Sequence, residues 1–101
     1  NYGTLHVSCV LKIAVLRQLT DDIYQDFTSR LNSRFTNLTD VDIQLCILIK
    51  LGFSISQIAI LTAISPTSVS QQKSRTKKRI QQQEPDCFAE GETLDLWLRK
   101  F

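Results

Sequence analysis

The sequence predicts an all-α fold, a bundle of about five to six helices. Apolar residues recur three or four positions apart along most of the chain, which is the spacing of one helix face. A serine or threonine precedes several of these stretches, where it would cap a helix N-terminus. With 101 residues, of which 43% are hydrophobic and 22% charged, the chain is typical of one small globular protein.

The first segment, residues 5–19, fits either a strand or a helix. Its apolar residues alternate as in a strand, but Val7, Val10 and Ala14 also share one helical face. We favour a helix, because no later segment offers a partner strand. Such a helix is apolar on nearly every side, so a second subunit or sequence upstream of residue 1 is expected to cover it. We therefore expect a homodimer that forms through this N-terminal segment.

A second helix is expected to begin near residue 20. Thr20 would cap it, and Asp21 and Asp22 would lie at the positive end of its dipole. Apolar residues then recur every four positions and would face the core: Ile23, Phe27, Leu31 and Phe35.

Two capping boxes mark the next two helices. Thr39 and Asp42 would cap a third helix that ends at Gly52, and Ser54 and Gln57 would cap a fourth. The expected buried face of the third helix consists of Val41, Leu45, Leu48 and Ile49.

A fifth helix should begin at Ser65-Pro66, because serine is a good cap and proline fits the first helical position. A short last helix should begin at Gly91 or Thr93. We divide the chain into an N-terminal helical segment (residues 1–36), a central domain (residues 37–83) and a linker with a short C-terminal helix (residues 84–101).

The fourth and fifth helices have the spacing of a helix-turn-helix unit. Ala59 is small enough for the two helix axes to cross closely, and Val69 would point back into the core. Ala63 stands in the short turn where glycine is common, so we expect a turn without positive φ. The expected architecture is a helix-turn-helix bundle with an N-terminal helical dimerisation segment.

The charge distribution indicates a polyanionic partner. The formal net charge is only +2. Residues 43–83, however, include six basic residues and no acidic one, whereas both ends of the chain carry more acidic than basic residues. Most of these cations lie in the fifth helix: Lys73, Arg75, Lys77, Lys78 and Arg79.

The outer face of the fifth helix divides into two halves. Its N-terminal half carries neutral polar residues that can reach base edges: Thr67, Ser68, Ser70, Gln71 and Ser74. Its C-terminal half carries the cations, whose long side chains suit DNA phosphates. Because recognition helices enter the major groove in this way, we expect residues 66–80 to read duplex DNA.

Residues 38–80 resemble the LuxR-type helix-turn-helix, the output domain of many bacterial response regulators and quorum-sensing regulators. The resemblance rests on Leu38-Thr39, Gly52-Phe53-Ser54, Ile58-Ala59 and Ile64-Ser65-Pro66-Thr67-Ser68-Val69. The Leu45-Cys46 pair and the basic stretch after Lys73 are similar to the Bacteroides-type regulators of this family.

The resemblance implies sequence-specific binding of double-stranded DNA and regulation of transcription, with RNA polymerase as a further partner. It implies base contacts from Ser70, Gln71 and Ser74, and phosphate contacts from Thr67, Lys73, Lys77 and Lys78. Arg75 is a further phosphate candidate by its charge. The family often has an apolar residue at the place of Thr76, so this threonine should loosen the inner face of the helix.

Other classes of function are less well supported. An enzyme is not expected, because the lone histidine, His6, has no nearby carboxylate and the glycines form no phosphate loop. No cofactor or metal is expected, because the three cysteines lack metal-ligand spacing. Cys9 and Cys46 lie in apolar stretches, as buried thiols of a reducing cytoplasm would.

No apolar run is long enough to span a membrane, and no membrane contact is expected. The absence of methionine indicates a piece of a longer protein. The main alternative function is a helical protein-interaction or assembly module with weak or no DNA binding. The polar outer face of residues 66–80 argues against it, because an interaction surface would favour apolar anchors.

Overall fold

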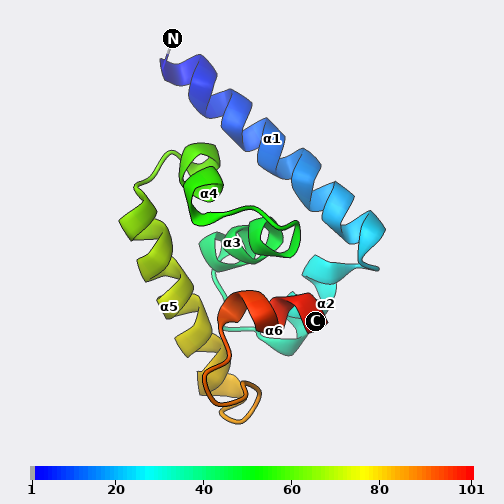
Figure 1. Ribbon diagram of the computed structural model, residues 1–101. Helices are drawn as coiled ribbons and strands as arrows, with labels where there is room; N and C mark the ends of the chain where they lie inside the picture. Colours follow the sequence, from blue (N-terminus) through cyan, green and yellow to red (C-terminus); the bar gives the residue numbers. More distant parts are fainter. Residues whose placement is uncertain (1) are drawn as a thin grey trace.

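The computed structural model describes the backbone of residues 2–101 and the side chains of residues 13–101. Every regular element in this part of the chain is a helix, so the prediction of an all-α fold is confirmed (Figure 1). The helices are α1 (Tyr2–Ile23), α2 (Phe27–Arg34), α3 (Asp40–Lys50), α4 (Ile55–Thr62), α5 (Pro66–Gln83) and α6 (Leu94–Lys100).

Helix α3 lies at the centre of the bundle. Helices α1, α2, α5 and α6 all pack against it, and α4 packs against α5. Nearly every apolar residue of α3 is buried, because the helix has neighbours on several sides. Figure 1 shows α1 running along one side with its N-terminal end beyond the rest of the molecule, and α5 along the opposite side.

Helix α6 is held in the core by aromatic contacts. The ring centroid of Trp97 lies 5.6 Å from that of Phe35 and 5.2 Å from that of Phe101. The Trp97 indole Nε1 donates a hydrogen bond to the carbonyl oxygen of Cys87 at 3.1 Å. Side chains from residues 1–36, 37–83 and 84–101 thus share one core.

Residues 5–19 all lie in α1, so the prediction of a helix rather than a strand is confirmed for them. The side chains of residues 5–12 lie outside the described part of the chain, so the expectations for their packing, including those for His6 and Cys9, stay predictions. The prediction of a buried thiol is confirmed for Cys46, which is inaccessible to solvent, and burial raises the pKa of this thiol.

The predicted start of the second helix at Thr20 is wrong. Helix α1 continues through Thr20 to Ile23, and the Thr20 hydroxyl donates to the Leu16 carbonyl oxygen at 2.6 Å within that helix. The break comes at Gln25 and Asp26, whose φ values are +50° and +59°. The Thr20 hydroxyl is therefore hydrogen-bonded inside α1 and does not cap a second helix.

Asp21 nevertheless lies at the positive end of α2. Its carboxylate accepts a hydrogen bond from the Thr28 backbone N–H at 2.9 Å and from the Thr28 hydroxyl. The last turn of α1 therefore supplies the cap for α2, because Asp26, the residue before α2, makes no side-chain cap of its own.

Two residues expected in the core are exposed. The side chains of Phe27, Leu31 and Phe35 are fully buried, but Ile23 is 56% exposed because it belongs to α1 rather than α2. Val41 is 55% exposed, while Leu45, Leu48 and Ile49 are buried as expected. Val41 lies in the first turn of α3, where the buried inward position is taken by Asp42.

The predicted helix signals are confirmed elsewhere. Thr39 with Asp42 and Ser54 with Gln57 form complete capping boxes at α3 and α4. Gly52 follows α3 with a φ of +92°, a conformation that L side chains adopt only with strain. Thr93 caps α6 through its hydroxyl. No helix in the described part of the chain is both long and apolar enough to cross a membrane.

Candidate nucleic-acid interface

The α4 and α5 helices form a helix-turn-helix, joined by residues 63–65. The Ser65 hydroxyl oxygen accepts from the Ser68 backbone N–H at 3.1 Å, and Pro66 takes the first helical position as predicted. Val69 is fully buried and Ala59 is 7% exposed, so both anchor the crossing of the two helices. These contacts fix the direction in which α5 leaves the turn.

Ala63 contradicts the expectation of a turn without positive φ. Its φ is +57°, in the left-handed region. This conformation lets the next residue, Ile64, donate its N–H to the Ala59 carbonyl oxygen at 3.1 Å, which closes the C-terminus of α4. The turn geometry therefore prevails over the preference of alanine for negative φ.

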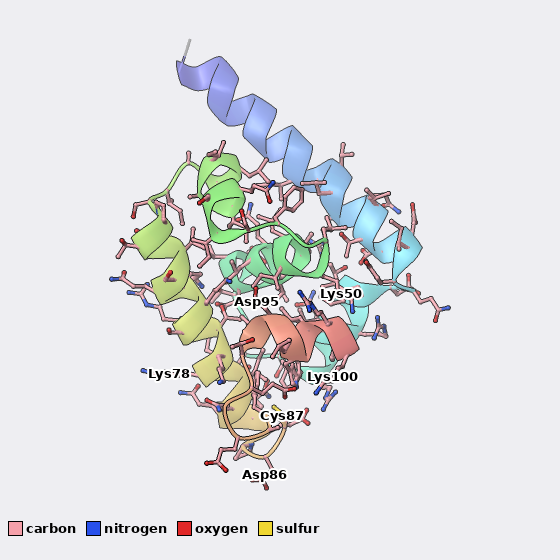
Figure 2. All side chains as sticks on the ribbon, viewed as in Figure 1. Lys50, Lys78, Asp86, Cys87, Asp95 and Lys100 are labelled. Carbon is pink, nitrogen blue, oxygen red and sulfur yellow. The ribbon has the colours of Figure 1, made fainter. Side chains whose placement is uncertain are left out.

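Six of the eight predicted contact residues lie exposed on α5. These are Thr67, Ser70, Gln71, Ser74, Arg75 and Lys78. At 3.6 residues per turn they share the side of the helix opposite Val69, Thr76 and Ile80, which are buried. We call these six residues the outer face of α5. Figure 2 shows Lys78 on α5, extending away from the bundle.

Lys73 and Lys77 are not on the outer face. They lie on the flank of α5 that contacts the C-terminal segment, residues 84–101. The Lys73 ammonium lies 3.0 Å from both carboxylate oxygens of Asp95, and its side chain is 18% exposed. The Lys77 ammonium donates to the Glu92 carbonyl oxygen and lies 5.0 Å from the centroid of the Phe88 ring.

The opposite flank of α5 is bound to a buried carboxylate. Asp42 is fully buried, and its Oδ1 accepts from the Thr76 hydroxyl at 2.6 Å and from the Gln72 amide at 2.7 Å. Arg79 Nη1 lies 2.9 Å from Oδ1 and 2.7 Å from Oδ2. The same carboxylate completes the capping box with Thr39. One side chain thus links the start of α3 to two turns of α5.

The expectation that Thr76 loosens the inner face of α5 is wrong. Its hydroxyl is buried but hydrogen-bonded to a charged acceptor, which is the condition under which a polar group is tolerated in a core. Burial raises the pKa of Asp42, but hydrogen bonds from Thr76, Thr39 and Arg79 outweigh it and hold this pKa below its ordinary value.

Sequence reasoning missed three residues that shape this interface: Asp42, Gln72 and Asp95. Asp42 was expected only as a partner in a capping box. The spacing of Gln72, Thr76 and Arg79 places three polar side chains along one flank of α5, where they can share one partner, but a solvent-exposed flank has the same spacing. Nothing in the sequence indicates that Asp95 contacts Lys73.

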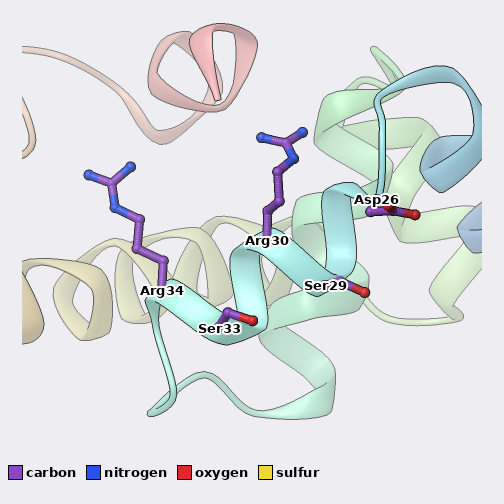
Figure 3. A pocket seen from close by; sticks show the side chains of 5 residues that line it. All are labelled: Asp26, Ser29, Arg30, Ser33 and Arg34. Carbon is purple, nitrogen blue, oxygen red and sulfur yellow. The ribbon is translucent and has the colours of Figure 1, made fainter.

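A second polar region, a shallow hollow on α2, is an unsuitable anion site. It is lined by Asp26, Ser29, Arg30, Ser33 and Arg34. Both guanidinium groups extend to the same side of the helix (Figure 3), but each is already bound. Arg30 donates to the carbonyl oxygens of Tyr24, Gln25 and Phe101, and Arg34 makes two 2.7 Å hydrogen bonds to Glu84.

Comparison of the chain with protein-family models, curated proteins and solved structures finds no match. Among the described residues, no group of His, Cys, Asp or Glu side chains is arranged to hold a metal ion. The candidate interface therefore stands on the geometry and chemistry of α5 alone.

Proposed function

We propose that this protein binds duplex DNA in a sequence-specific manner and regulates transcription, with the outer face of α5 in the major groove. The observation that carries the proposal is the order of side chains on this face. Thr67, Ser70, Gln71 and Ser74 come first, and Arg75 and Lys78 follow. Ser70, Gln71 and Ser74 can read base edges, while Thr67 and the two cations suit phosphates at the groove edge.

The helix-turn-helix geometry supports the proposal. The turn holds α5 by its N-terminal end, and Thr67, Ser70 and Gln71 are exposed on the first two turns that follow it. We also propose that the domain is of the LuxR type, on the residues of α4 and α5 that resemble that family. Contact with RNA polymerase and a cytoplasmic location belong to the same proposal.

The proposed phosphate contacts are fewer than the sequence suggests. Arg75 and Lys78 are exposed, whereas Lys73, Lys77 and Arg79 each have a partner within the protein. Thr67 lies in the first turn of α5, where its hydroxyl and the nearby backbone N–H groups favour a phosphate oxygen. Direct phosphate binding is therefore assigned to Thr67, Arg75 and Lys78.

Selection of binding sites from random duplexes tests the proposal. The wild type should enrich a defined sequence. Gln71→Ala should enrich a different or less defined one, because it removes a side chain that can pair with adenine. Gln82→Ala serves as the control, since Gln82 is exposed on the last turn of α5, away from the reading half. Enrichment of no sequence by the wild type contradicts sequence-specific binding.

A second candidate function, assembly with a helical partner, is favoured by a different observation. Val15, Leu19 and Ile23 are exposed and recur every four residues along α1, and so form an apolar stripe. We propose that two copies of the chain pair through this stripe. A pair would also suit DNA binding, because two recognition helices can contact two half-sites.

A further inference from the structure

The flank of α5 beside α6 contains a cation that is neutralised by the protein itself. Lys73 lies one position before Ser74 of the outer face, yet its ammonium group is directed to Asp95 in the first turn of α6. Both oxygens of Asp95 lie 3.0 Å from it. Figure 2 shows Asp95 near the beginning of α6 and Asp86 in the loop at the lower tip of the molecule.

A phosphate could replace Asp95 as the partner of Lys73. The Asp95 side chain is 40% exposed, so water and salt screen its attraction to Lys73. The lysine side chain has four rotatable bonds, and a change of rotamer would carry its ammonium towards the outer face. Helix α6 need not move, because Leu94, Trp97 and Leu98 hold it in the core.

We propose that Asp95 sets the affinity of the DNA interface by competing with a DNA phosphate for Lys73. This inference rests on the proposed function, because it assumes that the outer face of α5 faces DNA. In the free protein Lys73 is paired with Asp95 and adds little to non-specific attraction. Loss of the Asp95 charge releases Lys73 for one further phosphate contact.

The test compares two single-charge variants, Asp95→Asn and Asp86→Asn. Asp86 is exposed and makes no ion pair with the residues 13–101 whose side chains are described, so its variant has the same change in net charge without the release of a lysine. Fluorescence anisotropy with a labelled mixed-sequence duplex of about 30 base pairs gives the dissociation constant at several salt concentrations.

The expected result is a steeper salt dependence for Asp95→Asn. One further phosphate contact increases the slope of log K against log salt by about 0.9 and raises affinity several-fold at low salt. Asp86→Asn should keep the wild-type slope. Lys73→Gln should leave the wild-type slope unchanged, but it should cancel the increase when combined with Asp95→Asn.

Three results would overturn the inference. The first is an Asp95→Asn slope equal to that of Asp86→Asn. The second is an increase that persists in the double variant with Lys73→Gln. In both cases the wild type still binds DNA, so the proposed function survives. The third is the absence of duplex binding by both the wild type and Asp95→Asn, which overturns the proposed function as well.

Discussion

A single buried carboxylate, Asp42, fixes how α5 packs on α3. It caps α3 and accepts hydrogen bonds from Gln72, Thr76 and Arg79 of α5. A buried charge is costly unless all its acceptor sites are filled, and these donors fill them. The orientation of the outer face of α5 relative to α3 therefore depends on residues that do not belong to that face.

Replacement of Thr76 by valine should destabilise the protein by about 1–2 kcal/mol, because the shape is kept but a hydrogen bond to a charged group is lost. Thr67→Val, at an exposed position of the same helix, should change stability by less than about 0.5 kcal/mol. Urea unfolding followed by the fluorescence of the single tryptophan, Trp97, measures both. Equal effects of the two substitutions would contradict the role of Asp42 as an acceptor for Thr76.

Asp42 should also make stability sensitive to acid. Its pKa in the folded protein lies below the unfolded value of about 3.9, so its contribution is complete above that pH and is lost as pH falls through the folded pKa. The free energy of unfolding should therefore decline below about pH 4. Asp42→Asn should show a smaller decline.

Gln44→Asn, a substitution in the same helix that removes no titrating group, is the control for this acid titration and should keep the wild-type decline. An acid profile of Asp42→Asn that parallels the wild type would exclude Asp42 as the titrating group.

At the scale of elements, the helix-turn-helix depends on a strained residue in its turn. Ala63 has a φ of +57°, which costs a residue with a Cβ atom about 1–2 kcal/mol. Glycine adopts this conformation without strain but loses more entropy on folding. The balance predicts that Ala63→Gly stabilises the protein by about 0.5–1 kcal/mol.

Ala14→Gly is the comparison for this prediction, because it should change stability in the opposite direction. Ala14 is exposed within α1, so the same substitution should destabilise the protein by about 1 kcal/mol. Thermal unfolding of both variants measures whether each substitution raises or lowers the free energy of unfolding. Destabilisation by Ala63→Gly to the same extent would show that the turn carries no strain.

Local signals predicted most helix boundaries correctly, because capping boxes and glycine ends act within a few residues. They failed at Thr20, where a hydroxyl bonded to the preceding turn is as well satisfied as a capping hydroxyl. The pairing of Lys73 with Asp95 could not be predicted, because it joins helices separated by a linker. The sequence therefore predicted which residues of α5 carry charge, but not which of those charges remain free.

At the scale of the whole molecule, the exposed stripe of α1 leads to a prediction about assembly. If two copies pair through Val15, Leu19 and Ile23, sedimentation should detect a dimer of the wild type. Leu19→Glu should give a monomer with unchanged helicity, because a charge on the stripe opposes its burial.

Leu96→Glu is the matched control for this experiment. Leu96 of α6 is 46% exposed and Leu19 is 45% exposed, so the two substitutions differ in location rather than in burial. Leu96→Glu should remain dimeric. A monomeric wild type at about 100 μM, far above a micromolar dissociation constant, would rule out the pairing.

At the same scale, exposed cations on different helices allow a test of the proposal that DNA binds to the outer face of α5. Arg75 and Lys78 are exposed on the outer face of α5, while Arg17 of α1 and Arg99 of α6 are equally charged and exposed elsewhere. Removal of either pair changes the net charge by the same amount. A difference between the two pairs therefore reports where DNA binds rather than how strongly a cation attracts it.

The most direct test is the salt dependence of duplex binding by the wild type, Arg75→Gln/Lys78→Gln and Arg17→Gln/Arg99→Gln. We predict that the wild type binds at about 50 mM salt and that loss of the α5 pair lowers the slope by about 1.8, or 0.9 for each phosphate contact. The other pair should leave the slope unchanged. Equal loss of slope in both double variants, or no binding by the wild type, would contradict DNA recognition by the outer face of α5.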